Sequence, residues 1–271
     1  MKHSIEQLKQ RRQRKEKFTV VAAYDASFTG ALNEAGIEVI LVGDSLGMVV
    51  QGHDSTLPVS IEAMAYHTAA VERRNRDSAQ QALIIADMPF MSYADSHSAL
   101  ENAAELMRAG ANMVKLEGGV HIADTVEKLV QCGIPVCGHL GLTPQSVNTL
   151  GGYKVQGRSE QQQQQLLADA AAIERAGADF IVLECIPSTL AAAATEALDC
   201  ATIGIGAGGQ TDAQVLVCYD MLGMTDNPAR FVKNFLGAAE QASEKPIQQA
   251  FAAFKQAVEN GHYPGEEHQY S

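Results

Sequence analysis

The sequence predicts an α/β fold, a (β/α)8 TIM barrel with an N-terminal helical extension. About eight short apolar stretches typical of strands recur along the chain, and most of them are separated by amphipathic stretches with helical spacing. Strands that alternate with helices form parallel sheets, and near-continuous apolar strands are covered on both faces. Eight such units in about 250 residues match a (β/α)8 barrel in size. We therefore interpret residues 1–271 as one domain; a doubly wound open sheet is the alternative.

A repeated pattern indicates where the units begin. In residues 34–44, 108–118 and 175–185 an Ala-Gly pair is followed by a polar residue, a short apolar stretch and an acid. Glycine suits the end of a helix because it adopts the left-handed conformation without penalty. Further strands of the same type are expected at 18–25, 82–90, 134–140, 201–209 and 214–220, and amphipathic helices at 97–109, 121–132 and 160–176.

Composition limits the class of partner. The formal net charge of −12 argues against a nucleic-acid backbone or an anionic membrane surface as the main partner. The basic stretch 9–17 is expected to be the solvated face of a leading helix. No signal peptide and no membrane-spanning run are expected. Five cysteines without C-x-x-C spacing are typical of reduced thiols, so we expect a cytoplasmic protein.

Polar residues stand where the predicted strands end. In a parallel barrel all the carboxyl ends of the strands lie on one face, which is where barrel active sites form. Each acid alone is explained equally well as a helix cap. Several carboxylates on one rim repel one another unless a positive charge lies among them. Oxygen ligands without clustered His or Cys favour a hard cation such as Mg²⁺. We expect Asp25 and Asp220 to be helix caps. The strand-end residues are Asp25, Asp44, Asp87, Glu117, His139, Glu184 and Asp220.

Two further features have competing interpretations. Lys115 lies two residues before Glu117, so both side chains point to the same side of a strand. The pair is either a buried ion pair or a cation that holds a substrate carboxylate or a developing oxyanion. The segment 204–209 fits G-x-G-x-x-G, but no second strand ending in an acid follows about 20 residues later. We therefore expect a tight turn there, not a dinucleotide site.

Long segments of the chain resemble a known family. From about residue 18 to the C-terminus, in order, the sequence is similar to the ketopantoate hydroxymethyltransferases, and "GHLGLTPQSVN" is far more specific than any short motif. Departures are minor, such as Ala213 where glycine is expected. The matching segments are "AYD" (23–25), "VGDSLGMVVQGHDSTLPV" (42–59), "AYHTAAV" (65–71), "ADMPFMSY" (86–93), "NAAELMRAGANMVKLEGG" (102–119), "VCGHLGLTPQSVNTLGGYKVQGR" (136–158), "IVLECIP" (181–187), "IGIGAG" (203–208) and "YPGEEH" (263–268).

The resemblance implies a reaction and a metal. It implies a (β/α)8 barrel that transfers a hydroxymethyl group from 5,10-methylenetetrahydrofolate to 3-methyl-2-oxobutanoate in pantothenate synthesis. It also implies a bound Mg²⁺ and a homo-oligomer, with the family suggesting a decamer. Three carboxylates of this sequence match the family's metal site, namely Asp44, Asp87 and Glu117.

The resemblance also implies roles in catalysis and substrate binding. Glu184 matches the family's catalytic base. His139 is either a further substrate contact or a polar core histidine. The expected contacts to the 2-oxoacid come from Asp44, Ser45, Asp87 and Lys115.

Two other functions compete with this interpretation. The first is a Mg²⁺-dependent 2-oxoacid C–C lyase of the isocitrate lyase-like superfamily, which the chain resembles at the level of the fold. Those enzymes usually carry a loop with a reactive cysteine and a "KKCGH"-type stretch, and "VCGHLG" (136–141) lacks the basic lead. The second is a non-catalytic barrel that binds a 2-oxoacid or folate, for which loss of Glu184 or Lys115 would be the sign, and both are present.

Overall fold

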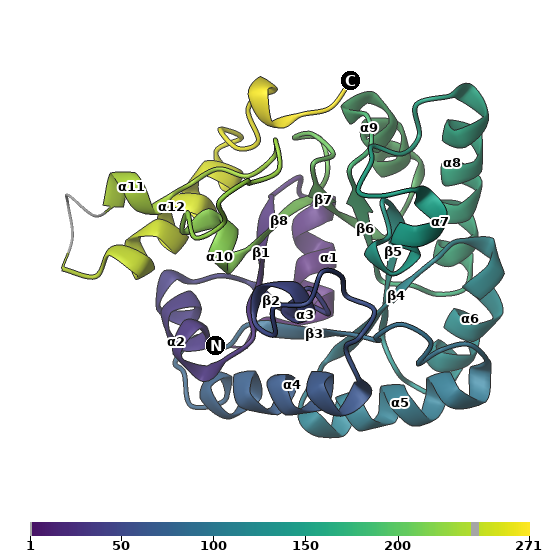
Figure 1. Ribbon diagram of the computed structural model, residues 1–271, viewed down its shortest axis with the longest axis horizontal. Coiled ribbons are helices and arrows are strands. Elements are labelled where there is room, and N and C mark those ends of the chain that lie inside the picture. The colour runs from purple at the N-terminus through teal and green to yellow at the C-terminus, as the bar shows by residue number, and fades with distance from the viewer. Residues whose placement is uncertain (1, 240–243) are drawn as a thin grey trace.

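The computed structural model describes residues 2–239 and 244–271. Eight parallel strands form a closed barrel in chain order, and β1 pairs with both β2 and β8 to close it (Figure 1). The predicted (β/α)8 barrel is therefore confirmed. The strands are β1 (Phe18–Ala22), β2 (Val39–Val42), β3 (Leu83–Asp87), β4 (Met113–Glu117), β5 (Val136–Gly141), β6 (Phe180–Glu184), β7 (Ala201–Ile205) and β8 (Ala213–Val217).

Helices surround the barrel, and the expected helices at 97–109, 121–132 and 160–176 correspond to α5, α6 and α8 (Figure 1). The α-helices are α1 (Ile5–Gln13), α2 (Ala26–Ala35), α3 (Leu46–Val49), α4 (Ile61–Asn75), α5 (Ser96–Ala109), α6 (Ala123–Gln131), α7 (Val147–Leu150), α8 (Glu160–Arg175), α9 (Ser188–Ala197), α10 (Cys218–Met221), α11 (Leu236–Ala239) and α12 (Pro246–Glu259). Short 3₁₀ helices are η1 (Val120–Ile122), η2 (Pro144–Ser146) and η3 (Glu266–His268).

The repeated Ala-Gly pattern ends helices as expected. Gly36 follows α2 with φ 76° and Gly110 follows α5 with φ 114°, both in the left-handed region. Asp25 is the N-cap of α2, where its carboxylate accepts hydrogen bonds from the amides of Ser27 and Phe28. Asp25 is therefore a cap, unlike the strand-end acids described below.

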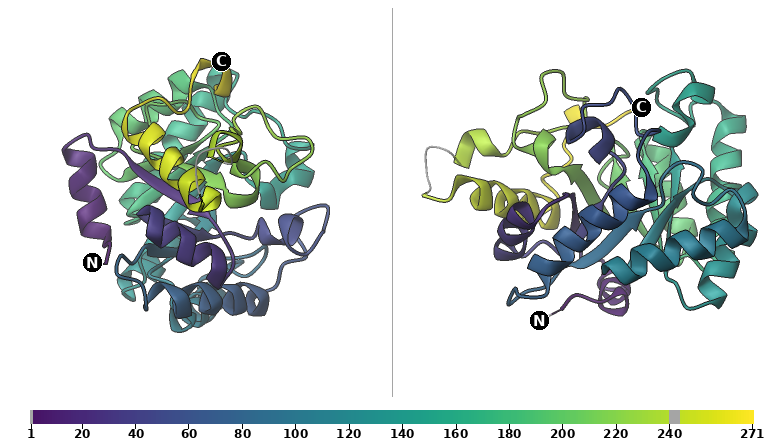
Figure 2. Two further views of the ribbon diagram at one scale, coloured as in Figure 1. Left: turned by 90° about the vertical axis from the view of Figure 1, so that its left-hand side faces the viewer. Right: turned by 60° about the horizontal axis from the view of Figure 1, so that its bottom comes forward.

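The N-terminal helix α1 covers the end of the barrel where the strands begin. Figure 2 shows α1 and α3 at opposite ends of the molecule. Lys9 and Arg12 pair with Asp179 and Asp212, which immediately precede β6 and β8. The basic stretch 9–17 is thus not simply a solvated face, because its charges bind acids at the strand starts.

The buried carboxylate of Glu38 is the centre of this attachment. Glu38 precedes β2 and is 1% exposed. Its oxygens accept hydrogen bonds from Arg11 (2.7 Å), from the Thr19 amide (3.0 Å) and from Lys255 of α12. Burial favours the protonated acid, but the charges and hydrogen bonds of these partners outweigh burial and lower the pKa of Glu38. One carboxylate therefore joins α1, β1, β2 and α12.

The glycine-rich segment 204–209 forms a turn that packs against the chain itself. A side chain at Gly206 would meet the Phe231 ring at 2.8 Å, and one at Gly208 would meet Ser188 at 2.5 Å. Both glycines have positive φ, at 59° and 80°. The segment is therefore the expected tight turn, and its glycines are explained by packing.

All five cysteines are free thiols, and four of them are buried. In the part of the chain that the structure describes, none of the helices combines the length and apolar character needed to cross a membrane.

The first prediction concerns Glu38→Gln, which should lower the free energy of unfolding by about 3 kcal/mol at neutral pH, as expected when one member of a buried ion pair is removed. Because the pKa of Glu38 is lowered in the folded state, its stabilisation is present above the ordinary glutamate pKa. It is lost as the pH falls through the lowered value. Urea unfolding across the acid range measures the difference.

The matched control is Glu16→Gln, which removes an exposed pair with Arg14 and should cost less than about 1 kcal/mol. An equal loss in both variants, or a difference between wild type and Glu38→Gln that persists in acid, would contradict this account.

Candidate active site

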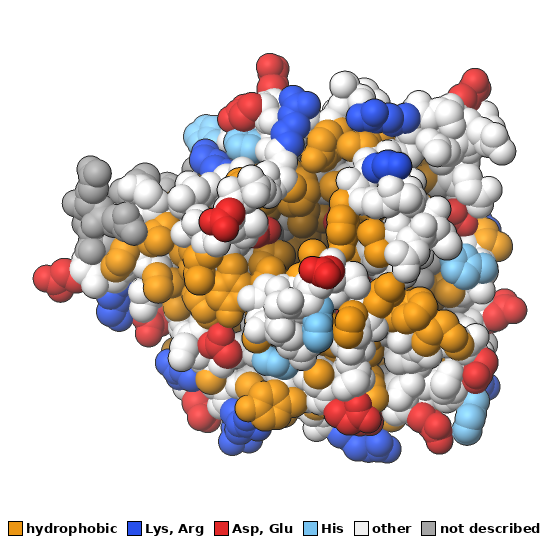
Figure 3. All heavy atoms as spheres, in the orientation of Figure 1, with side chains coloured by type: hydrophobic (Ala, Val, Ile, Leu, Met, Phe, Trp, Pro, Cys, Tyr) orange, Lys and Arg blue, Asp and Glu red, His pale blue; other side chains and the backbone are white. Residues whose placement is uncertain are grey.

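A cavity of about 310 Å³ opens at the carboxyl ends of the strands. Figure 3 shows a hollow at this face with hydrophobic side chains around it. Exposed Met48 and Tyr153 lie at its rim, where the Tyr153 hydroxyl donates a hydrogen bond to Met48 Sδ at 3.4 Å. The lining includes all the predicted site residues: Asp44, Ser45, Asp87, Lys115, Glu117, His139 and Glu184.

Asp44 and Asp87 meet at the ends of β2 and β3. The Asp44 amide donates a hydrogen bond to Asp87 Oδ2 at 3.0 Å, and both residues are 3% exposed. Gly43 leaves room for the Ser45 hydroxyl, because a side chain at Gly43 would lie 2.8 Å from Ser45 Oγ. Burial, followed by the charges of Asp87 and Glu117, raises the pKa of Asp44 well above its usual range. Burial also raises the pKa of Asp87.

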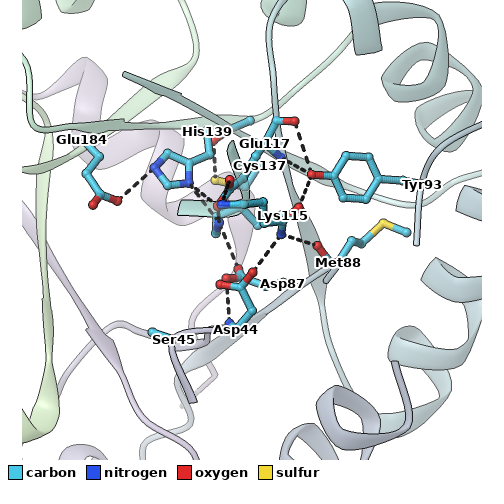
Figure 4. A network of polar contacts seen from close by, with 12 residues as sticks. Asp44, Ser45, Asp87, Met88, Tyr93, Lys115, Glu117, Cys137, His139 and Glu184 are labelled. Atoms are coloured by element: carbon cyan, nitrogen blue, oxygen red, sulfur yellow. Dashed lines mark hydrogen bonds and ion pairs between the residues drawn. The ribbon is translucent and has the colours of Figure 1, made fainter. Parts of the chain in front are cut away.

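The ammonium group of Lys115 lies among these carboxylates (Figure 4). Lys115 Nζ is 3.3 Å from Asp87 Oδ1 and 3.8 Å from Glu117 Oε1. Register explains the arrangement, since Asp87 pairs with Lys115 across β3–β4 and Glu117 pairs with His139 across β4–β5. Burial lowers the pKa of Lys115, but the carboxylates outweigh it and the net shift is upward. The expected inward orientation of Lys115 and Glu117 is confirmed.

His139 connects the carboxylate cluster to Glu184. Its Nδ1 lies 3.4 Å from Glu117 Oε1, and its Nε2 lies 3.1 Å from Glu184 Oε2. Burial and the charge of Lys115 favour the neutral ring, but the two glutamates outweigh them and raise the pKa of His139 to about 9. His139 therefore holds a polar position inside the site and is not an isolated core histidine.

The backbone directly after Glu184 adopts an unusual conformation. Cys185 has φ 47°, a left-handed value that side chains other than glycine rarely adopt. Two backbone hydrogen bonds hold it there: its amide donates to the Ile205 carbonyl, and its carbonyl accepts from the Gln156 amide, each at 2.9 Å. Such strain concentrates at functional sites. The turn ends β6 at Glu184, whose side chain is 16% exposed at the cavity.

Ser45 lies beside Asp44 at the start of α3, as the sequence predicted, and it has a partner that sequence reasoning missed. The hydroxyl groups of Ser45 and Tyr24 lie 2.8 Å apart, and Tyr24 is buried at the end of β1. Tyr24 belongs to the segment "AYD" (23–25), which resembles the family, and this resemblance was the feature of the sequence that could have identified Tyr24 as a site residue.

Sequence reasoning also missed Gln145, which contacts the carboxylates, and Tyr93, which contacts Gln145. Gln145 Nε2 donates a hydrogen bond to Asp44 Oδ2 at 2.8 Å, and the Gln145 amide donates one to Glu117 Oε2 at 3.0 Å. The Tyr93 hydroxyl donates to Gln145 Oε1 at 2.5 Å. Neutral side chains on loops carry no charge pattern, so only their presence in the matching segments pointed to them.

The carboxylate cluster has oxygen atoms that bear on metal binding. Among the described residues, no group of three or more His, Cys, Asp or Glu side chains is arranged to hold a metal ion in this conformation. Two buried oxygens nevertheless accept no hydrogen bond, Asp87 Oδ1 and Glu117 Oε1. Buried polar atoms are normally satisfied, and carboxylate oxygens are the ligands that hard cations prefer. The donor set therefore fits a divalent cation, although these side chains must adjust to bind it.

Fold and site together define a (β/α)8-barrel enzyme with a charged centre at the carboxyl ends of its strands. The family model described as ketopantoate hydroxymethyltransferase matches residues 2–266. Relatives named 3-methyl-2-oxobutanoate hydroxymethyltransferase are 55% identical in Pectobacterium atrosepticum and 54% in Marinobacter nauticus, each over 98% of both chains. The chain belongs to the ketopantoate hydroxymethyltransferase family.

Solved structures with the same fold are more distant. Phosphonopyruvate hydrolase has a TM-score of 0.62 at 12% identity and covers 97% of this chain and 100% of its own. A 2,3-dimethylmalate lyase has a TM-score of 0.58 at 15% identity and covers 98% and 100%. At these identities the likeness concerns the fold alone.

The second prediction is that Lys115→Met destabilises the protein in a metal-chelating buffer by about 3 kcal/mol, because it removes a buried charge that compensates Asp87 and Glu117. Urea unfolding measures the loss. Lys9→Met breaks a more exposed pair with Asp179 and should cost less than about 1 kcal/mol. A Lys115 variant as stable as wild type would show that the carboxylates do not depend on this charge.

Proposed function

We propose that this protein transfers a hydroxymethyl group from 5,10-methylenetetrahydrofolate to 3-methyl-2-oxobutanoate, giving 2-dehydropantoate (ketopantoate), in pantothenate biosynthesis. Family membership supports the reaction. The observation that carries it is the position of Glu184, which ends β6 beside His139, across the barrel from Asp44 and Asp87 at the ends of β2 and β3, within one cavity. The reaction needs this separation, because a carboxylate bound to a cation is a weak base.

The metal part of the proposal is a Mg²⁺ ion held by the carboxylates of Asp44, Asp87 and Glu117. The unsatisfied oxygens of Asp87 and Glu117 support it. A fold neighbour, phosphonopyruvate hydrolase, is known in complex with oxalate and Mg²⁺, and a 2-oxoacid offers a similar pair of adjacent oxygens. When bound, Mg²⁺ would polarise the carboxylate and keto oxygens of the substrate as a Lewis acid.

The remaining chemistry belongs to side chains of this protein. Ser45 can donate a hydrogen bond to the substrate carboxylate, and Lys115 adds positive charge where the enolate oxygen develops. Glu184 removes the C3 proton, which is acidic because C3 adjoins the ketone. His139 Nε2 lies 3.1 Å from Glu184 Oε2, so the role of His139 in this proposal is to position the base. The C3 carbon then forms a bond to the methylene carbon of the donor. The bonds from that carbon to the two folate nitrogens break, one water molecule supplies the hydroxyl group, and tetrahydrofolate leaves.

The apolar side of the cavity suits the folate donor. Its lining includes Met48, Val49, Tyr153, Val217 and Phe231, which offer a surface for a flat ring system. With the folate bound over the cavity, these side chains would also limit the access of bulk water to the enolate, which water would otherwise protonate.

Assembly into a homo-oligomer is also part of the proposal. Tyr66 and Met91 are 68% and 63% exposed and do not line the cavity. Large exposed apolar side chains outside a site are typical of contact surfaces.

The lyase alternative has weaker support. Fold neighbours that carry lyase or hydrolase names share only 12–16% identity with this chain. The relatives at about 55% identity are transferases by name. A non-catalytic barrel is disfavoured, because Glu184 and Lys115 both line the cavity.

The third prediction concerns Glu184→Gln. It should slow deuterium exchange at C3 of 3-methyl-2-oxobutanoate by at least about a hundredfold, because the amide cannot accept the proton. Binding of Mg²⁺ and of the 2-oxoacid should change little. Proton NMR in D₂O measures the exchange, and exposed Glu196→Gln is the matched control. Exchange at the wild-type rate would exclude Glu184 as the base.

The fourth prediction concerns Asp44→Ala. It should weaken Mg²⁺ and 2-oxoacid binding together, each by at least about tenfold, because both depend on one cluster. Calorimetric titration measures the two affinities. Asp25→Ala removes a carboxylate that only caps α2, so it should reduce stability and leave both affinities unchanged. Loss of one affinity alone would contradict joint binding of metal and substrate.

A further inference from the structure

Gln145 donates hydrogen bonds to the carboxylate cluster from both its backbone amide and its side chain. It lies in η2, directly after β5, and is 7% exposed. Its backbone amide donates to Glu117 Oε2, while its side-chain Nε2 donates to Asp44 Oδ2 at 2.8 Å and to the Met88 carbonyl at 2.9 Å. One residue therefore binds carboxylates that come from β2 and from β4.

The chemistry of these partners fixes the orientation of the Gln145 amide. The Met88 carbonyl can only accept hydrogen bonds, and so can the ionised Asp44 carboxylate. The NH₂ side of the amide must therefore face both of them. The amide oxygen faces the other way, where the Tyr93 hydroxyl donates to it at 2.5 Å. A flipped amide would place its oxygen against two acceptors, the Met88 carbonyl and the Asp44 carboxylate.

Tyr93 connects the same glutamine to Glu117 by a second route. Its hydroxyl oxygen accepts a hydrogen bond from the Glu117 backbone amide at 3.3 Å, and Figure 4 shows Tyr93 beside Glu117. Glu117 is thus held at its backbone by Tyr93 and at its side chain by Gln145. After these contacts, Glu117 Oε1 and Asp87 Oδ1 accept no hydrogen bond, and the charge that they face is the ammonium group of Lys115, at 3.8 Å and 3.3 Å.

We propose that Gln145 and Tyr93 are positioning residues, which hold Asp44 and Glu117 so that their remaining oxygens face a divalent cation. The inference rests on the metal site in the proposed function and adds residues to which no role in the reaction has been given above. Outer partners of this kind orient metal ligands, and their removal typically weakens metal affinity by roughly 10- to 100-fold.

A purely structural role makes a different prediction. A buried glutamine that only satisfies the core would, when replaced, reduce the free energy of unfolding without changing affinity for a cation. Gln214 provides that comparison. It is 2% exposed, and its Nε2 donates to the Gly208 carbonyl at 2.9 Å and to Thr211 Oγ1 at 2.7 Å.

The fifth prediction compares Gln145→Met with Gln214→Met in the full-length protein. Methionine keeps the length of the side chain and removes both donors. Mg²⁺ binding without substrate is measured by calorimetry, and thermal unfolding is measured in a chelating buffer. Gln145→Met should raise the Mg²⁺ dissociation constant by at least about tenfold. Gln214→Met should leave it within about twofold of wild type, although both variants lose stability.

Tyr93→Phe gives a second test that keeps Gln145 in place. It should weaken Mg²⁺ binding by less than Gln145→Met does, because the amide loses only its fixed orientation. Tyr263→Phe is its control, since that hydroxyl donates to the Phe231 carbonyl at 2.6 Å, away from the cluster. If Gln145→Met does not fold, the comparison of Tyr93→Phe with Tyr263→Phe still tests the inference.

The outcomes separate this inference from the proposed function. Wild-type Mg²⁺ affinity in Gln145→Met or Tyr93→Phe overturns the inference alone, and so does an equal loss of affinity in the two controls. A wild-type protein that binds no Mg²⁺ contradicts the metal site of the proposed function itself.

Discussion

Three buried carboxylates, Asp44, Asp87 and Glu117, are held together by the positive charges among them. Like charges at such close range are costly when water is excluded, and burial together with mutual repulsion raises the pKa of Asp44. Lys115 offsets part of this cost from within 4 Å of Asp87 and Glu117, and His139 offsets part of it on the other side. A divalent cation would complete the compensation, which is why we regard the cluster as built to bind one.

The barrel makes this arrangement possible by its topology. Neighbouring parallel strands deliver their last residues to one end, so the cluster forms without any long excursion of the backbone. The opposite end has a different charge centre, in which Glu38 binds Arg11 and Lys255 and attaches the terminal helices. Stability and chemistry are therefore supplied at separate ends, and the acid that stabilises one end does not compete with the acids of the site.

The sequence predicted the barrel because strand and helix patterns are local, and it predicted Asp44, Lys115 and Glu117 because their charges stand at strand ends. It also favoured a cap for Asp25, and Asp25 does cap α2, whereas Asp44 lines the cavity. Both acids follow strands, so the tertiary contacts of each could not be read from the sequence. Gln145 was not predicted from its own residue type, because its role depends on which carboxylates a 3₁₀ turn happens to reach. Such contacts depend on loop geometry, which periodicity does not encode.

The most direct test of the account uses the unmodified protein. Exchange of the C3 proton of 3-methyl-2-oxobutanoate is followed by proton NMR in D₂O, with Mg²⁺ or with a chelator, and with no folate present. We expect exchange that requires Mg²⁺ and needs no folate, with 2-dehydropantoate appearing only after 5,10-methylenetetrahydrofolate is added. Exchange at the same rate in the chelator would contradict the claim that the carboxylate cluster and a divalent cation activate the substrate.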